Sequence, residues 1–91
     1  MRNYEIITIF QEGQDIQASK KSFQEILERN AVKIASEEDW GVRKLPHSLK
    51  RQHNGFYHYI SCEMDPAKVK DVNHDMLILQ DILHHMISAV N

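Results

Sequence analysis

The stretch that decides the fold is residues 56–66, which read Phe56-Tyr57-His58-Tyr59-Ile60-Ser61-Cys62-Glu63-Met64-Asp65-Pro66. Residues 56–64 alternate between two faces, as in a strand with one buried side. The side expected to face the core carries His58, Ile60, Cys62 and Met64. The other side carries Tyr57, Tyr59, Ser61 and Glu63. Asp65-Pro66 then marks a helix start, with aspartate as the N-cap and proline at the first helical position.

The elements before this strand can be placed in the same way. Residues 4–10 (YEIITIF) are β-branched and aromatic, which predicts a strand buried on both faces in the middle of a sheet. Asp15 is the expected N-cap of a helix whose inner side carries Ile16, Phe23, Ile26, Leu27 and Asn30. A second strand begins at Val32 and resumes after an acidic segment, residues 37–39. It is expected to bend at Trp40-Gly41, and a hairpin turn is expected at residues 51–55, with Asn54-Gly55 as the signal.

The elements after it complete the pattern. The second helix should bury Val69, Val72, Met76 and Leu79, and residues 82–90 read as an edge strand. The order is strand, helix, strand, strand, helix, strand. Two right-handed crossovers then interlock into an α+β, ferredoxin-like βαββαβ sandwich, with a four-stranded antiparallel sheet and two helices on one face. We expect a single domain over residues 1–91, with the first and third strands in the middle of the sheet.

The uncovered sheet face is the expected binding surface. It should carry Tyr57 and Tyr59 from the third strand and His85, Ile87 and Ala89 from the last strand. Aromatic and aliphatic side chains exposed together on one face mark a place where a partner binds.

Positive charge is concentrated in one stretch of a chain whose formal net charge is −2. Four of the eleven Lys and Arg residues lie between Arg43 and Arg51, and no carboxylate lies between Asp39 and Glu63. Cationic charge beside aromatic residues suits a polyanion, and RNA is the first candidate. The alternative is a solvated hairpin whose Lys and Arg residues protect a sheet edge from aggregation.

Composition favours a soluble protein of the cytoplasm. The chain is 42% hydrophobic and 26% charged, and its one cysteine, Cys62, excludes an internal disulfide and fits a reducing compartment. The N-terminal residues do not resemble a signal peptide, and no apolar run approaches the roughly 20 residues of a membrane span. We therefore expect no membrane partner.

The sequence gives little support for a catalytic site or a metal site. The six histidines lack known ligand spacing, Cys62 lies on the buried face of its strand, and no Ser-His-Asp or Cys-His arrangement is apparent. An acylphosphatase-like hydrolase shares the fold but needs a glycine-rich cradle with an arginine, whereas residues 11–15 hold one glycine, no arginine and two acids. We expect no catalytic residue, cofactor, metal ion or small-molecule substrate. A metabolite-sensing module that dimerises through its open sheet is the alternative, but it leaves the basic stretch without a role.

Four segments carry a resemblance to a known family. They are residues 1–5 (MRNYE), 41–45 (GVRKL), 55–57 (GFY) and 63–66 (EMDP), and the likeness extends over all 91 residues. The chain resembles the bacterial small-subunit ribosomal proteins of the S-six family. The resemblance implies a structural role in the cytoplasmic ribosome. It also implies a partner protein of the S-eighteen family, with which the chain would bind the central domain of the small-subunit rRNA.

The resemblance also suggests site residues. Arg2, Arg43, Lys44 and Lys50 match basic family positions, and with the neighbouring Arg51 and His53 they form the predicted RNA-binding set. The predicted partner-binding set is Tyr57, Tyr59, His85 and Ile87, in which the two tyrosines match bulky family positions. This chain has His84-His85 where arginines are common in the family. Neutral imidazole cannot supply that charge, so attraction there would be weaker or pH-dependent.

Overall fold

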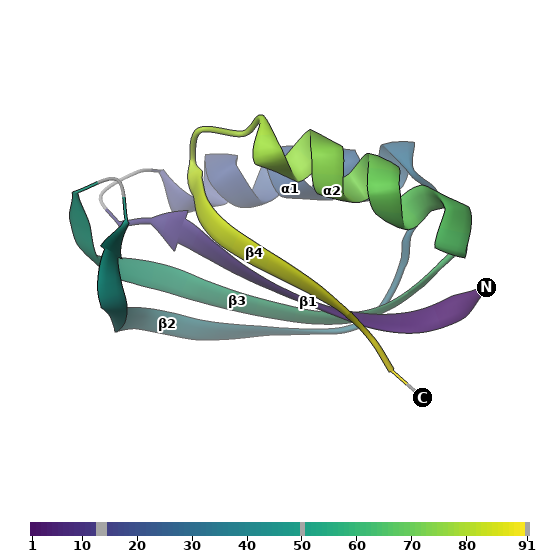
Figure 1. Ribbon diagram of the computed structural model, residues 1–91, viewed down its shortest axis with the longest axis horizontal. Coiled ribbons are helices and arrows are strands. Elements are labelled where there is room, and N and C mark those ends of the chain that lie inside the picture. The colour runs from purple at the N-terminus through teal and green to yellow at the C-terminus, as the bar shows by residue number, and fades with distance from the viewer. Residues whose placement is uncertain (13–14, 50, 91) are drawn as a thin grey trace.

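The computed structural model describes residues 1–12, 15–49 and 51–90. The elements follow the predicted order (Figure 1). They are β1 (Arg2–Gln11), α1 (Ile16–Arg29), β2 (Lys33–Leu49), β3 (Gln52–Met64), the 3₁₀ turn η1 (Pro66–Lys68), α2 (Val69–Leu77) and β4 (Ile82–Ala89).

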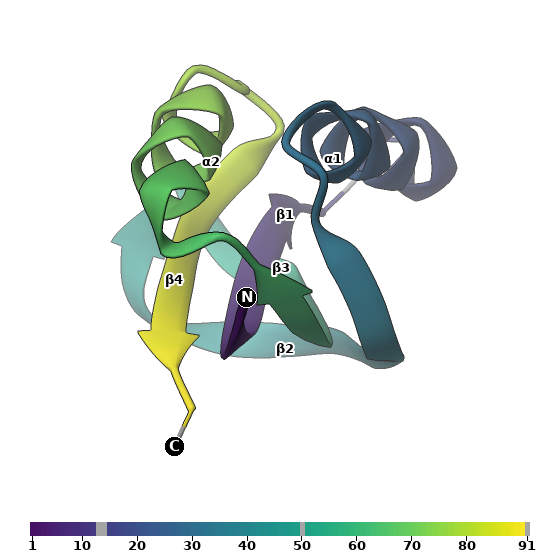
Figure 2. The ribbon, with the colours of Figure 1, turned by 90° about the vertical axis from the view of Figure 1, so that its right-hand side faces the viewer.

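The sheet is antiparallel with the strand order β2-β3-β1-β4. The first and third strands are therefore central and the second and fourth are edges, as predicted. Both helices lie on the same side of the sheet, and the other side carries no helix (Figure 2). The expected ferredoxin-like α+β fold is confirmed.

Both predicted aspartate caps are present. The Asp15 carboxylate accepts hydrogen bonds from the backbone N–H groups of Gln17 and Ala18, at 3.1 and 3.3 Å. Asp65 accepts one from Ala67, at 2.9 Å. The first turn after Asp65 is 3₁₀ rather than α, so the second helix begins as η1 and continues as α2. Each cap satisfies helical N–H groups that lack an intrahelical partner.

The main core lies between the helices and the sheet. Phe23 and Leu27 of α1 and Val72 and Met76 of α2 are almost fully buried against the inner face of β1 and β3. Phe23 meets Phe10 of β1 edge to face, with ring centroids 6.1 Å apart. Burying each large apolar side chain contributes about 1.5–3 kcal/mol, so these residues hold the helices on one face.

The acidic segment does not interrupt the second strand, contrary to prediction. Glu37, Glu38 and Asp39 pair with Ile60, Tyr59 and His58 of β3, and β2 is continuous from Lys33 to Leu49. Because β2 is an edge strand, these carboxylates reach solvent, where charge costs little. The expected bend at Trp40-Gly41 is confirmed, because the register shifts between Asp39 and Gly41, and Gly41 has a φ of 81°.

The predicted hairpin turn at Asn54-Gly55 is wrong. Leu49 pairs with Gln52, so the chain reverses between them, and Arg51 has a φ of 64°. Gly55 instead lies within β3 and pairs with Gln11 of β1 and with β2. A Cβ at Gly55 would collide with Cγ2 of Ile9 and lie 3.4 Å from Cδ2 of Leu45. Glycine is therefore present for close packing and not for a turn.

Candidate functional site

The strand register shows which side chains face away from the helices. Cross-strand partners in an antiparallel sheet share a face. Ile7 pairs with Tyr59 on one side and Met86 on the other, and Ile9 pairs with Tyr57 and His84. These residues lie on the open face, so the predicted placement of both tyrosines there is confirmed.

The predicted placement of His85, Ile87 and Ala89 on the open face is wrong. They pair with Thr8, Ile6 and Tyr4, which face the helices, and Ile87 packs against the main core. Nε2 of His85 donates a hydrogen bond to Oδ1 of Asn73 in α2, at 2.7 Å. The cause is a register shift between Ile9 and Phe10. Strict alternation from the buried Ile82 would put residues 85, 87 and 89 on the open face, and the irregularity reverses that parity.

An apolar groove of about 420 Å³ lies on the open face. Its lining is contributed by all four strands and consists of Ile7, Ile9, Trp40, Leu45, Pro46, His47, Tyr57, His84 and Met86. A second small core of Ile9, Leu45 and Leu83, with Tyr57 packed against it, shares Ile9, Leu45 and Tyr57 with this lining. Leu45 and Leu83 come from the two outermost strands, so the sheet curls toward its open face. This face therefore holds a groove with a small core of its own, where the sequence predicted a bare surface.

Trp40 lies at the rim of this groove and was not among the predicted site residues. Its ring stacks on Tyr59, with centroids 5.4 Å apart and planes 6° apart. The guanidinium of Arg43 lies 5.6 Å from the centroid of Trp40, and its Nε donates to the Trp40 carbonyl at 3.4 Å. The bulge at Gly41 turns Trp40 onto the open face. Its signal in the sequence is an aromatic residue beside a glycine in an edge strand, a pattern that predicts only a bend.

The half of the open face around Tyr59 is acidic. Glu38 of β2 pairs with Tyr59, and Glu5 of β1 pairs with Ser61, the next residue of β3 on the same face. Desolvation, together with the charges of these carboxylates and a hydrogen bond to Glu5, raises the pKa of Tyr59. The tyrosine therefore stays neutral, and this half of the face disfavours an approaching phosphate.

The predicted RNA-binding residues do not form one cluster. Arg43, Lys44, Arg51 and His53 are exposed near the hairpin end of the sheet, while Lys50 lies outside the described residues. Arg43 pairs with Gly55 and faces the open side, whereas Lys44 pairs with Asn54 and faces the other side. Arg2 begins β1 at the opposite end of the sheet, about 30 Å away at roughly 3.4 Å per residue. Within residues 1–12, 15–49 and 51–90, no salt bridge joins Arg43, Lys44 or Arg51 to a carboxylate.

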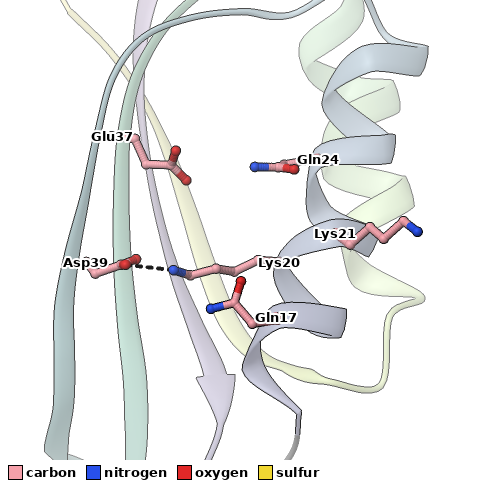
Figure 3. Close-up of a pocket in the computed structure, with 6 residues that line it drawn as sticks. All are labelled: Gln17, Lys20, Lys21, Gln24, Glu37 and Asp39. Atoms are coloured by element: carbon pink, nitrogen blue, oxygen red, sulfur yellow. Dashed lines mark hydrogen bonds and ion pairs between the residues drawn. The ribbon is translucent and has the colours of Figure 1, made fainter.

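A second, polar pocket of about 640 Å³ lies between α1 and β2 (Figure 3). Lys20 points from α1 toward Asp39 of β2 and forms an ion pair of 2.7 Å, while Lys21 points away. Behind it, the buried His58 donates from Nε2 to Glu37, at 2.6 Å. Lys20 also lies 5.4 Å from the centroid of the Phe56 ring. Of these contacts, the ion pair between Lys20 and Asp39 joins α1 to β2, and the hydrogen bond between His58 and Glu37 joins β3 to β2.

The described part of the chain gives little support for a metal site or a reactive thiol. No group of three or more His, Cys, Asp or Glu side chains there could hold a metal ion. Cys62 is 1% exposed, and burial raises its pKa to about 11, so the thiol is protonated and inert, as predicted. No helix in these residues is long and apolar enough to cross a membrane.

His85 should make stability depend on pH. Burial and the neighbouring His84 lower the pKa of His85. The unfolded chain then binds the proton more tightly, so the folded state loses stability as pH falls through the ordinary histidine value of about 6.5. Urea denaturation should therefore show that the wild type loses more unfolding free energy than a His85→Gln variant between about pH 8 and pH 5.5. A constant difference between the two proteins over that range would contradict this assignment.

The fold and the open apolar face are those of a ferredoxin-like protein with a surface suited to binding. The model of one family, described as "Ribosomal protein S6", matches residues 3–89. The small ribosomal subunit protein bS6 of Leptospira biflexa is 32% identical over 91 residues, covering all of this chain and 99% of that protein. The bS6 protein of Treponema pallidum is 29% identical, with coverage of 100% and 99%.

A solved structure agrees with these sequence relatives. The crystal structure of 30S ribosomal protein S6 from Thermotoga maritima superposes with a TM-score of 0.87 at 19% identity, covering 98% of this chain and 87% of that one. At that identity the likeness shows the fold alone. On the family match and the full-length relatives, the chain belongs to the ribosomal protein S6 family of the small ribosomal subunit. The predicted family is confirmed. It is a family of structural proteins of the cytoplasmic ribosome and not of enzymes.

Proposed function

We propose that the chain is a non-catalytic RNA- and protein-binding component of the small ribosomal subunit, acting as one domain over residues 1–91. In this proposal the open-face groove binds a ribosomal protein of the S-eighteen family. The basic hairpin end contacts the central domain of the small-subunit rRNA. Family membership supports the ribosomal setting, and the observation that carries the division of roles is the charge distribution on the open face.

The groove supports a protein contact. Its lining is mostly aliphatic and aromatic, and Met86, 48% exposed, lies on the same face as the stacked Trp40 and Tyr59. Such a surface gains most by excluding water against another apolar surface, and Trp and Tyr are enriched where proteins bind tightly. The carboxylates of Glu5 and Glu38 repel a phosphate backbone but attract a cationic protein segment. Base stacking on Tyr57 and Tyr59 is therefore the weaker interpretation.

The hairpin end supports the RNA contact. Arg43, Lys44 and Arg51 are exposed, and the described residues place no carboxylate in a salt bridge with them. Cations of this kind neutralise phosphates, and each contact makes binding more dependent on salt. These contacts fix position without reading base sequence, so specificity would come from RNA shape and the partner protein. Arg2, at the far end of the sheet, would need a separate contact.

Charge reversal at the hairpin end tests this proposal. Arg43→Glu with Lys44→Glu should weaken assembly with the partner and rRNA, because each lost phosphate contact lowers the slope of log K against log salt by about 1. Binding is measured by reconstitution of the partner–rRNA complex over a salt series, and the matched control is Lys21→Glu on the outer side of α1. An unchanged affinity and slope for the double variant would remove these residues from the RNA interface.

A further inference from the structure

The two edge strands of the sheet are built differently. The edge strand β2 holds charged residues along its length (Lys33, Glu37, Glu38, Asp39, Arg43 and Lys44), with Pro46 and three register shifts. All of these features discourage another strand from pairing with it. The opposite edge strand, β4, reads ILHHMISA and contains no Asp, Glu, Lys, Arg or Pro. One edge is therefore guarded against strand addition and the other is not.

The backbone of β4 offers alternate groups to its outer edge. The Val90 N–H donates to the Asn3 carbonyl, at 2.9 Å, so Asn3 and Val90 are a hydrogen-bonded pair of the ladder between β1 and β4. The register is regular from Tyr4 to Ile9, and hydrogen-bonded pairs alternate in an antiparallel ladder. The N–H and C=O groups of His85, Ile87 and Ala89 therefore point away from β1. In the described part of the chain, no further strand pairs with this edge, and Figures 1 and 2 show it at the outside of the sheet.

Apolar surface lies beside this edge. A pocket of about 310 Å³, the edge pocket, lies between α2 and β4. It is lined by Asn73, Met76, Leu77, Ile82, Leu83, His84 and His85. Leu77 and Ile78, at the end of α2, are 67% and 65% exposed. When a peptide adds to a sheet edge, its main chain supplies the hydrogen bonds, and pockets beside the edge receive its alternate side chains. Both requirements are met along β4.

The open-face groove and this edge are continuous. His84 lines both the groove and the edge pocket, and Met86 of the same strand lines the groove. A protein bound on the open face would therefore reach the edge without crossing a charged barrier. RNA is the poorer occupant, because β4 holds no Lys or Arg to neutralise phosphate.

We propose that the outer edge of β4 binds an extended, largely apolar segment of the protein partner as an added strand. This inference rests on the proposed function, in which that partner occupies the open face. The added strand would pair with the backbone of His85, Ile87 and Ala89 and place apolar side chains against Leu77 and the edge pocket.

Amide hydrogen exchange by NMR separates this inference from the proposed function. The probe is the S-eighteen family protein of the same organism, added to the full chain. We expect the outward amides of His85, Ile87 and Ala89 to exchange at least about tenfold more slowly in the complex. The inward amides of Met86 and Ser88, already bonded to β1, should change less and serve as internal controls.

A substitution provides a second readout. Ala89→Pro removes one outward N–H and leaves the ladder to β1 in place, so it should weaken partner binding about 2- to 10-fold, the effect of one hydrogen bond. Ala89→Ser keeps the N–H and is the matched control. Thermal unfolding of both variants shows whether the fold is retained.

Four results would overturn the inference. If the complex forms without protecting the outward amides, the edge is unused while the proposed function stands. If no complex forms, the proposed function and this inference fail together. Protection in the free chain that grows with its concentration would make a second copy the occupant. Protection by rRNA alone would make the edge an RNA site.

Discussion

Replacing Trp40 with alanine is expected to weaken binding of the protein partner by about 30-fold or more, which corresponds to about 2 kcal/mol. The Trp40 ring stacks on Tyr59 and lies against the guanidinium of Arg43, so it holds both side chains at the rim of the open-face groove. Truncation would remove that apolar area and leave both neighbours without their contact. Isothermal titration calorimetry with the S-eighteen family protein measures the loss.

The matched control for this prediction is Ile34→Ala. Ile34 lies on the same strand and is 38% exposed, but it pairs with the buried Cys62 and therefore faces the helix side. We expect the control to bind the partner within a factor of about two of the wild type, as for a residue outside an interface. Equal losses for Trp40→Ala and Ile34→Ala would show that the partner does not select the open face.

Adding one methyl group at Gly55 is expected to cost about 1–3 kcal/mol of unfolding free energy. The new Cβ would collide with Cγ2 of Ile9 and press against Leu45, at the place where the curled sheet forms its second small core. Urea denaturation of Gly55→Ala measures the loss. Gly41→Asn is the control, because a Cβ there has nothing within 4 Å and asparagine tolerates a positive φ.

A double-mutant cycle identifies the collision as the cause. Ile9→Ala removes the Cγ2 atom that a Cβ at Gly55 would strike, so Gly55→Ala should cost less in that background. The change in backbone propensity from glycine to alanine at residue 55 is the same in both backgrounds, so it cancels from the comparison. The same cost in both would show that sterics at Ile9 are not why glycine occupies this position.

Local signals in the sequence were sufficient for most of the fold. The N-caps at Asp15 and Asp65 depend on hydrogen bonds to residues two or three positions away, and the alternation in residues 56–64 depends only on strand geometry. For the same reason, the open-face placement of Tyr57 and Tyr59 could be predicted. These features need no knowledge of which strands pair.

The errors arise where long-range pairing overrides a local pattern. The register shift at the start of β4 reverses its parity, which moves His85 and Ile87 to the helix side, and nothing within residues 82–90 reveals it. Asn54-Gly55 has the composition of a hairpin turn, but Gly55 is required by Ile9 of another strand. Trp40 is a candidate site residue because the bulge brings its ring onto Tyr59 of β3, a contact that its neighbours in the sequence do not predict.

Trp40 also provides the most direct test of the proposal that the open sheet face binds the protein partner. It is the only tryptophan of the chain and it lines the groove, so its fluorescence reports on occupation of that face. A tryptophan-free S-eighteen family protein should shift Trp40 emission to shorter wavelength and saturate at one partner per chain. A complex that forms, as judged by sedimentation, while Trp40 emission stays unchanged would contradict the assignment of this face.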